Sequence, residues 1–176
     1  MFAVAGCGPA SFKLGNMTEE EQSPAQYAAE IEGARDRFIA FAESCTAEQW
    51  NAAPLEGDPR PVGVVADHVA DAYEYLAGWM RQILRGEMVT VNSDVVDSLN
   101  AEHAAAAMAV TRTEAAEHLR RSGAAISALV AGCTAGELKA GDGRVERLAQ
   151  IAIRHADDHR TEMQAALAAS ADRARN

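Results

Sequence analysis

The chain has 176 residues, five prolines and a formal charge of −10, from 16 basic and 26 acidic residues. This length predicts one domain with a substantial core, and the alanine-rich, proline-poor composition favours helix. The negative charge disfavours nucleic-acid binding, and no apolar run approaches the roughly 20 residues that span a bilayer. The three cysteines lie far apart and form neither a C-x-x-C motif nor an even disulfide set, so we expect a reduced, cytoplasmic protein.

Residues 1–17 are expected to be a disordered leader, because they show no helical period and no charged region typical of a signal peptide. The segment 4–7 is similar to a bacterial lipidation motif, but the hydrophobic stretch that normally precedes one is missing. The domain is therefore predicted over residues 18–170, with 171–176 as a C-terminal tail.

The first helix is predicted over residues 24–44, because Ser23 can cap it and Pro24 suits its first position. A short helical turn that ends at Trp50 is expected next. Residues 51–60 contain two prolines and a glycine and are predicted to form a loop.

The second helix is predicted from Pro61 to the residue before Gly86. Its apolar residues repeat at alternating steps of three and four, which is the pattern of a helix-bundle seam. The seam residues are Val62, Val65, Val69, Ala72, Leu76, Trp79 and Ile83. His68 lies about 60° from the centre of this seam, on the same flank as Tyr75 and Trp79.

Residues 93–110 are predicted to form an alanine-rich third helix. A fourth helix, to about residue 130, opens after Thr111, which forms a capping box with Glu114. Several glycines then precede a last helix over residues 144–169. No segment alternates with the period of a strand, so the predicted fold is all-α, a four-helix bundle with an extra short helix in a crossover.

Two histidines, His155 and His159, lie four residues apart in the last helix, within about 30° of the centre of its apolar face. A buried imidazole needs a partner for each ring nitrogen, and a pair at this spacing commonly shares a metal ion. The alternative is a pair of hydrogen-bonded core histidines. An open metal site needs a third protein ligand, and His68 is the best third candidate in the sequence.

Other polar residues are weaker candidates. For His103 a core or interface histidine is favoured over a fourth metal ligand, and His118 is expected to be exposed. Glu162 is predicted on the inner face, one turn beyond the histidine pair, as a catalytic candidate that could orient a ligand, take a proton or coordinate the metal. The alternative for this residue is a carboxylate at the open end of the bundle. Asp157 and Asp158 are expected to be solvated.

A histidine early in the second helix, followed by H-x-x-x-H in the last, resembles the DinB-like superfamily. The resemblance covers about residues 18–169 and includes the segments RPVGVVADHVADAYEYL, LNAEHAAAA and IRHADDHRTEM. It implies an up-down-down-up four-helix bundle, often dimeric, that binds a divalent metal through His68, His155 and His159. Relatives include mycothiol-dependent maleylpyruvate isomerase and bacillithiol transferases. Some iron enzymes of the wider superfamily use H-x-x-x-H-x-E, but Glu162 falls one residue too late for that pattern.

Three functions are compatible with these residues. The favoured one is a metal-dependent enzyme that acts on a small-molecule substrate with a low-molecular-weight thiol, as a transferase, isomerase or hydrolase. The alternatives are a non-catalytic metal-binding or stress-response dimer, and a helical dimerisation module without metal. Zinc or nickel is the expected ion, with iron or manganese as alternatives. We expect a homodimer without nucleic-acid or membrane partners.

Overall fold

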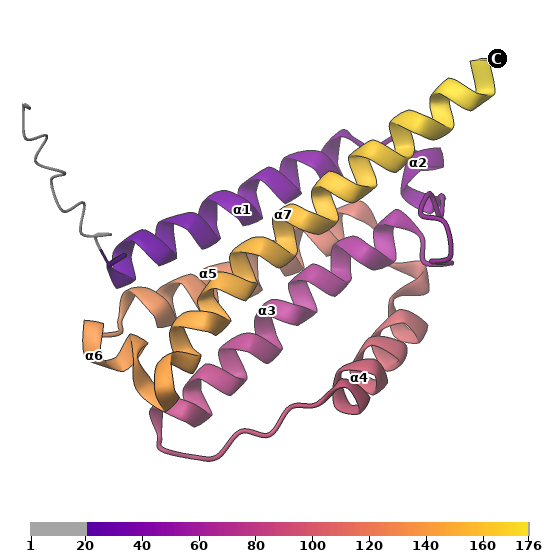
Figure 1. Cartoon of the computed structure of the whole chain (residues 1–176). Helices are drawn as coiled ribbons and strands as arrows, with labels where there is room; N and C mark the ends of the chain where they lie inside the picture. Colours follow the sequence, from indigo (N-terminus) through magenta and orange to yellow (C-terminus); the bar gives the residue numbers. More distant parts are fainter. Residues whose placement is uncertain (1–20, 176) are drawn as a thin grey trace, which may run out of the picture.

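The computed structural model describes residues 21–175 of the chain, and within this range it contains helices and no strand (Figure 1). The all-α prediction is therefore confirmed. The predicted leader, residues 1–17, lies outside the described residues. The helices are α1 (Pro24–Ser44), α2 (Ala47–Asn51), α3 (Val62–Leu84), α4 (Ser93–Ala106), the 3-10 helix η1 (Ala107–Ala109), α5 (Arg112–Ala131), α6 (Ala135–Leu138) and α7 (Ala140–Arg175).

The four long helices pack side by side as a bundle. Helix α1 packs against α5 and α7, and α3 packs against the same two helices. Figure 1 shows that α1 and α7 run in one direction, whereas α3 and α5 run in the opposite direction. The shorter α4 lies in the connection between α3 and α5 and packs against the outside of α3. No helix in residues 21–175 combines the length and apolarity needed to cross a membrane.

Local capping signals set the helix starts. Ser23 and Thr111 each accept a hydrogen bond from the backbone three residues ahead, and both belong to capping boxes. Helix α7 has left-handed backbone angles at residues 141–143, so its regular part begins at Arg144, as the glycines predict. The helix continues to Arg175, beyond the predicted end at residue 169.

The core lies between the four long helices and is almost entirely apolar. Each helix contributes large side chains that are fully buried, among them Ile31 and Phe38 of α1, Tyr73 and Met80 of α3, Leu119 and Ile126 of α5, and Met163 of α7. Two residues of the predicted α3 seam, Ala72 and Trp79, are only half-buried and line a pocket instead.

The short helix α2 fixes the start of α3. The Trp50 indole lies so close to the backbone of Gly63 that a Cβ placed there would be 2.6 Å from its Cε2 atom. The indole Nε1 also donates a hydrogen bond of 3.0 Å to the carbonyl of Val110. Trp50 thereby connects the first turn of α3 to the segment before α5, and His68 lies in the following turns of α3.

Candidate metal centre

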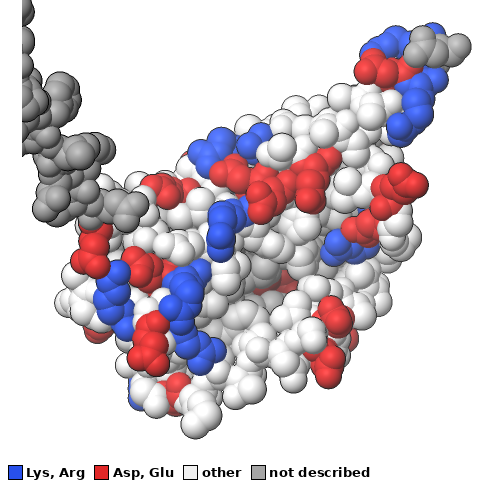
Figure 2. Space-filling view, viewed as in Figure 1, with Lys and Arg blue, Asp and Glu red and all other residues white. Residues whose placement is uncertain are grey.

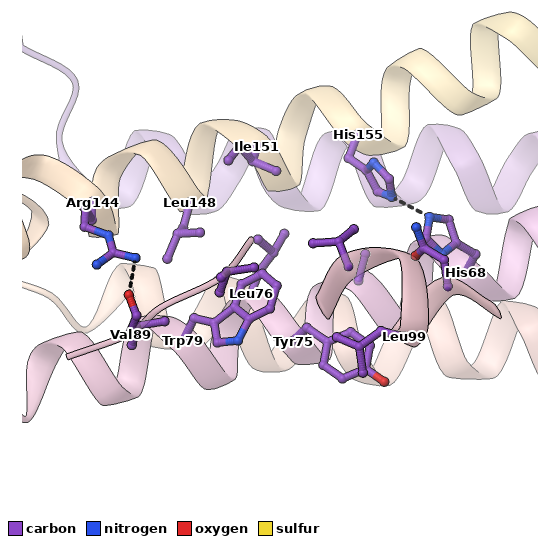
Figure 3. Close-up of a pocket in the computed structure, with 14 residues that line it drawn as sticks. His68, Tyr75, Leu76, Trp79, Val89, Leu99, Arg144, Leu148, Ile151 and His155 are labelled. Atoms are coloured by element: carbon purple, nitrogen blue, oxygen red, sulfur yellow. Dashed lines mark hydrogen bonds between the residues drawn. The ribbon is translucent and has the colours of Figure 1, made fainter. Parts of the chain in front are cut away.

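The structure brings the three predicted histidines together. His68 comes from α3, and His155 and His159 come from successive turns of α7. One ring nitrogen of each lies within 4.8 Å of the others, and the Nε2 atoms of His68 and His155 are 3.2 Å apart (Figure 3). Among residues 21–175, no carboxylate or thiol belongs to this group.

The inner face of α7 explains why both of its histidines reach this point. Ala152, Ala156 and Met163 are completely buried on the same face of the helix. A spacing of four residues places the two imidazoles one above the other on that face. The small alanines leave room for the rings between α7 and α3.

Burial keeps the three imidazoles neutral. Desolvation, followed by repulsion from the neighbouring imidazoles, lowers the pKa of His68 to about 3. The same causes lower the pKa of His155 to about 4. Desolvation also lowers the pKa of His159. Near pH 7 each ring therefore keeps a lone pair on one nitrogen, which is the form that binds metal.

The donor set fits a divalent cation. A hydrogen bond between the Nε2 atoms of His68 and His155 would satisfy only that pair of nitrogens. The Nδ1 atom of His159 is buried without a hydrogen-bond partner, and a carboxylate oxygen of Glu162 lies 3.6 Å from it, beyond hydrogen-bond distance. Nitrogens bound to a tetrahedral zinc ion at about 2.0–2.1 Å lie about 3.3–3.4 Å apart, which is close to the 3.2 Å observed. A zinc-like ion could accept the lone pairs of all three rings.

The loop between α2 and α3 lies beside the three histidines. Its Asp58 and Arg60 form an ion pair, with 2.7 Å between Oδ2 and Nη2. The positive charge of Arg60 contributes to the lowered pKa of both His68 and His155, after the larger effect of burial. The site therefore lies toward the end of the bundle that carries this loop.

A second histidine cluster adjoins the site without joining it. Asp67, next to His68 in α3, accepts hydrogen bonds from Nε2 of His103 at 3.0 Å and from Nδ1 of His118 at 2.8 Å. Burial alone would raise the pKa of Asp67, but these two hydrogen bonds hold it well below its usual range. The hydrogen bond to Asp67 raises the pKa of His118. Asp67 thus connects α3 to both α4 and α5.

This cluster corrects one prediction. The His118 side chain is only 18% exposed, so its expected solvent exposure was wrong. It lies one step off the apolar face of α5, and the sequence alone does not show that Asp67 approaches that flank from α3. His103 is packed between helices, with 5.7 Å between its ring centroid and that of His68, and it lies outside the metal-binding group.

Two acidic residues of α7 also differ from expectation. The Glu162 side chain is 58% exposed, and its Oε2 atom lies 3.6 Å from Nδ1 of His159, so it lies at the edge of the site rather than on the inner face. Asp157 is not a simple solvated charge, because it accepts two hydrogen bonds from Arg37 of α1, at 3.0 and 2.6 Å. No local pattern signals this pairing between residues 120 positions apart.

An apolar pocket of about 380 Å³ opens beside the histidines (Figure 3). Tyr75 and Trp79 form one wall, with ring centroids 6.2 Å apart and planes inclined by 23°. The remaining lining residues are His68, Ala72, Leu76, Val89, Val91, Val96, Leu99, Asn100, Arg144, Leu148, Ile151 and His155. Tyr75 and Trp79 share the flank of His68 on α3, and all three side chains border the pocket. The surface between α7 and α4 is largely uncharged (Figure 2).

Comparison with known proteins agrees with this geometry. The family model described as the DinB superfamily matches residues 30–163, a range that contains all three histidines. Searches of curated proteins and of solved structures found no match. The family match spans well over half of the chain and is accompanied by an all-helical fold and a histidine group that could hold a metal ion. The chain therefore belongs to the DinB superfamily.

Proposed function

We propose that the chain is a metal-dependent enzyme that acts with a low-molecular-weight thiol, as a transferase or an isomerase. One observation carries the proposal, namely that three imidazoles converge and that two of them, those of His68 and His155, also line an apolar pocket. Three protein ligands leave at least one coordination position for a small molecule. When bound there, a divalent ion supplies Lewis acidity, which lowers the pKa of a thiol or of water.

The residues of the chain have separate roles in this proposal. His68, His155 and His159 hold the ion, for which zinc or nickel is the expected identity. The apolar walls of the pocket keep bulk water away from the reacting group. Glu162, at the edge of the site and 3.6 Å from His159, is proposed to orient that imidazole or to accept a proton.

A non-catalytic metal-binding or stress-response protein is the second candidate. The pocket lining supports it in one respect, because within the described part of the chain it includes no carboxylate and no cysteine that could act as a general base beside the substrate. The two candidates differ in whether a thiol reaches the metal.

We also propose that the protein is cytoplasmic and forms a homodimer. Light scattering of the purified protein would test the homodimer through its mass.

The deciding experiment uses cobalt-substituted protein purified without a histidine tag. We expect a low-molecular-weight thiol to produce new sulfur-to-cobalt charge-transfer bands, and thiol consumption when an electrophile is added. Mycothiol, bacillithiol and glutathione are the thiols to compare. If thiols leave the cobalt spectrum unchanged while azide alters it, the metal is open but the thiol assignment is wrong. If neither alters it, the site is closed and the non-catalytic candidate is favoured.

A further inference from the structure

We propose that the pocket beside the histidines binds an elongated apolar carboxylate, with its apolar chain along the pocket and its anionic group on Arg144. The inference rests on the proposed function, because it names the substrate class for the same site. It is carried by three features of the pocket: the chemistry of its walls, the position of one unpaired cation, and the separation of its two polar ends.

The walls select an apolar ligand. Aliphatic side chains from α3, α4, α7 and the segment after α3 face the cavity, among them Leu76, Leu99, Leu148 and Val89. The half-buried Trp79 adds a broad aromatic surface. The volume of about 380 Å³ lies toward the lower end of the roughly 300–1,000 Å³ typical of small-molecule sites. A slender hydrophobic chain would fill such a space and remove its walls from water.

Arg144 gives the pocket a positive charge. The chain has 26 acidic residues, yet none of those in the described range 21–175 lines the pocket, and within that range Arg144 is the one Lys or Arg among the lining residues. Its Nη2 atom donates a hydrogen bond of 2.8 Å to the carbonyl of Val89. Within residues 21–175, no carboxylate lies within 4.0 Å of its guanidinium nitrogens. A guanidinium has five N–H donors in a planar fork that matches a carboxylate.

The distance between the two polar ends of the pocket, Arg144 and the histidines, determines how long the ligand must be. Arg144 and His155 belong to the same helix and are eleven residues apart, which corresponds to about 16 Å along the helix axis. Figure 3 shows them at opposite ends of the row of pocket residues on α7, with Leu148 and Ile151 between them. A ligand held at Arg144 must therefore be elongated if its other end is to reach the histidines. A medium-chain alkanoate has this form.

The test compares acids with alcohols of the same chain length. Isothermal titration calorimetry would measure octanoate, decanoate, octanol and decanol on metal-free and on zinc-loaded protein. The variant is Arg144→Met, and the matched control is Arg147→Met. Arg147 lies one turn further along α7, is exposed, and also donates one hydrogen bond to a backbone carbonyl, that of Asp142 at 2.7 Å. Both variants remove one positive charge, but only Arg144 lines the pocket.

We expect Arg144→Met to weaken decanoate binding by about tenfold or more, with decanol binding unchanged and with Arg147→Met like the parent. Retained decanol binding also shows that the pocket of the variant is intact.

Equal losses for acid and alcohol would mean that Arg144 only shapes the pocket, which overturns the proposal. Binding of decanoate that needs zinc and ignores Arg144 would place the carboxylate at the histidines, which also overturns it. So would absence of binding by all four compounds. No turnover is measured, so a wrong thiol assignment leaves this result unaffected.

Discussion

The His155 side chain shows most directly why the site points to a bound ion. Its Nε2 atom faces that of His68 at 3.2 Å, and its ring centroid is 4.5 Å from that of His159. Three imidazoles in a largely apolar interior lose their hydrogen bonds to water, and few hydrogen bonds within the protein replace them. A cation shared by the three rings would offset that cost.

The stability of the metal-free protein should fall on acidification. The pKa of His68 is about 3 and that of His155 about 4 in the folded chain, whereas an unfolded histidine titrates near ~6.5. Below about pH 6.5 these histidines bind more protons in the unfolded chain than in the folded chain. Their contribution to the free energy of unfolding is therefore complete above that pH and is lost as the pH falls toward 4. We expect a loss on the order of 1–2 kcal/mol per histidine at about pH 5, measured by urea unfolding with a chelator present.

The matched variant for this measurement is His155→Gln, which removes one of the depressed groups. Its free energy of unfolding should depend less on pH than that of the parent chain. An identical pH dependence in both proteins would mean that His155 is not responsible for the acid sensitivity.

At the scale of single residues, part of the site could be predicted from the sequence. His68, His155 and His159 could be predicted because the position of a residue on a helix face follows from its spacing from apolar neighbours. The partners of His118 and Asp157 could not be predicted, because Asp67 and Arg37, respectively, approach these residues from other helices. Arg144 was predicted only as the start of a helix, because a pocket arises from several segments at once.

At the scale of elements, the contact between α2 and α3 determines how α3 begins. Trp50 packs on the bare backbone of Gly63, where even a methyl group would collide with the indole. The same indole donates a hydrogen bond to the backbone carbonyl of Val110, so the contact also positions the segment that leads into α5. The orientation of α3, and with it the direction of His68, depends on this close approach.

Gly63→Ala should therefore destabilise the protein by about 1–3 kcal/mol through overpacking. Gly78→Ala is the matched control on the same helix, because a Cβ at Gly78 meets nothing within 4 Å. That control should be neutral or stabilising by up to about 1 kcal/mol, since alanine is the better helix former. Denaturant unfolding of the two variants measures both effects, and equal stabilities would contradict the role given to the glycine.

Element boundaries were predictable where local hydrogen bonds decide them. The structure starts α1 at Pro24 and α5 at Arg112, each directly after the predicted capping residue. The end of α7 was less predictable, because alanine-rich sequence without a stop signal extends a helix at little cost. The half-burial of Trp79 depends on α4 and its connection, whose positions no local pattern specifies.

For the whole molecule, the site joins two helices that are distant in the sequence. Helices α3 and α7 are neighbours in the bundle, and the histidine group lies between them. An ion held by both helices binds the folded chain and not the unfolded one, so it stabilises the whole bundle by mass action. The rest of the fold depends on the apolar core.

Removal of the ion should lower the melting temperature without abolishing the fold. When the free ion is about 100-fold above its Kd, the stabilisation is about 2.7 kcal/mol, which corresponds to roughly 5–10 °C for a domain of this size. Thermal unfolding followed by circular dichroism, with and without a chelator, measures the shift. Complete unfolding of the chelated protein at room temperature would show that the core alone is insufficient.

The most direct test of the central claim is the metal content of protein purified without a histidine tag. The parent chain should carry close to one divalent ion per chain by elemental analysis. His155→Ala should lose it, while His118→Gln, which changes a histidine outside the group of three, should keep it. Full metal occupancy in His155→Ala would contradict the account and would place the ion elsewhere in the protein.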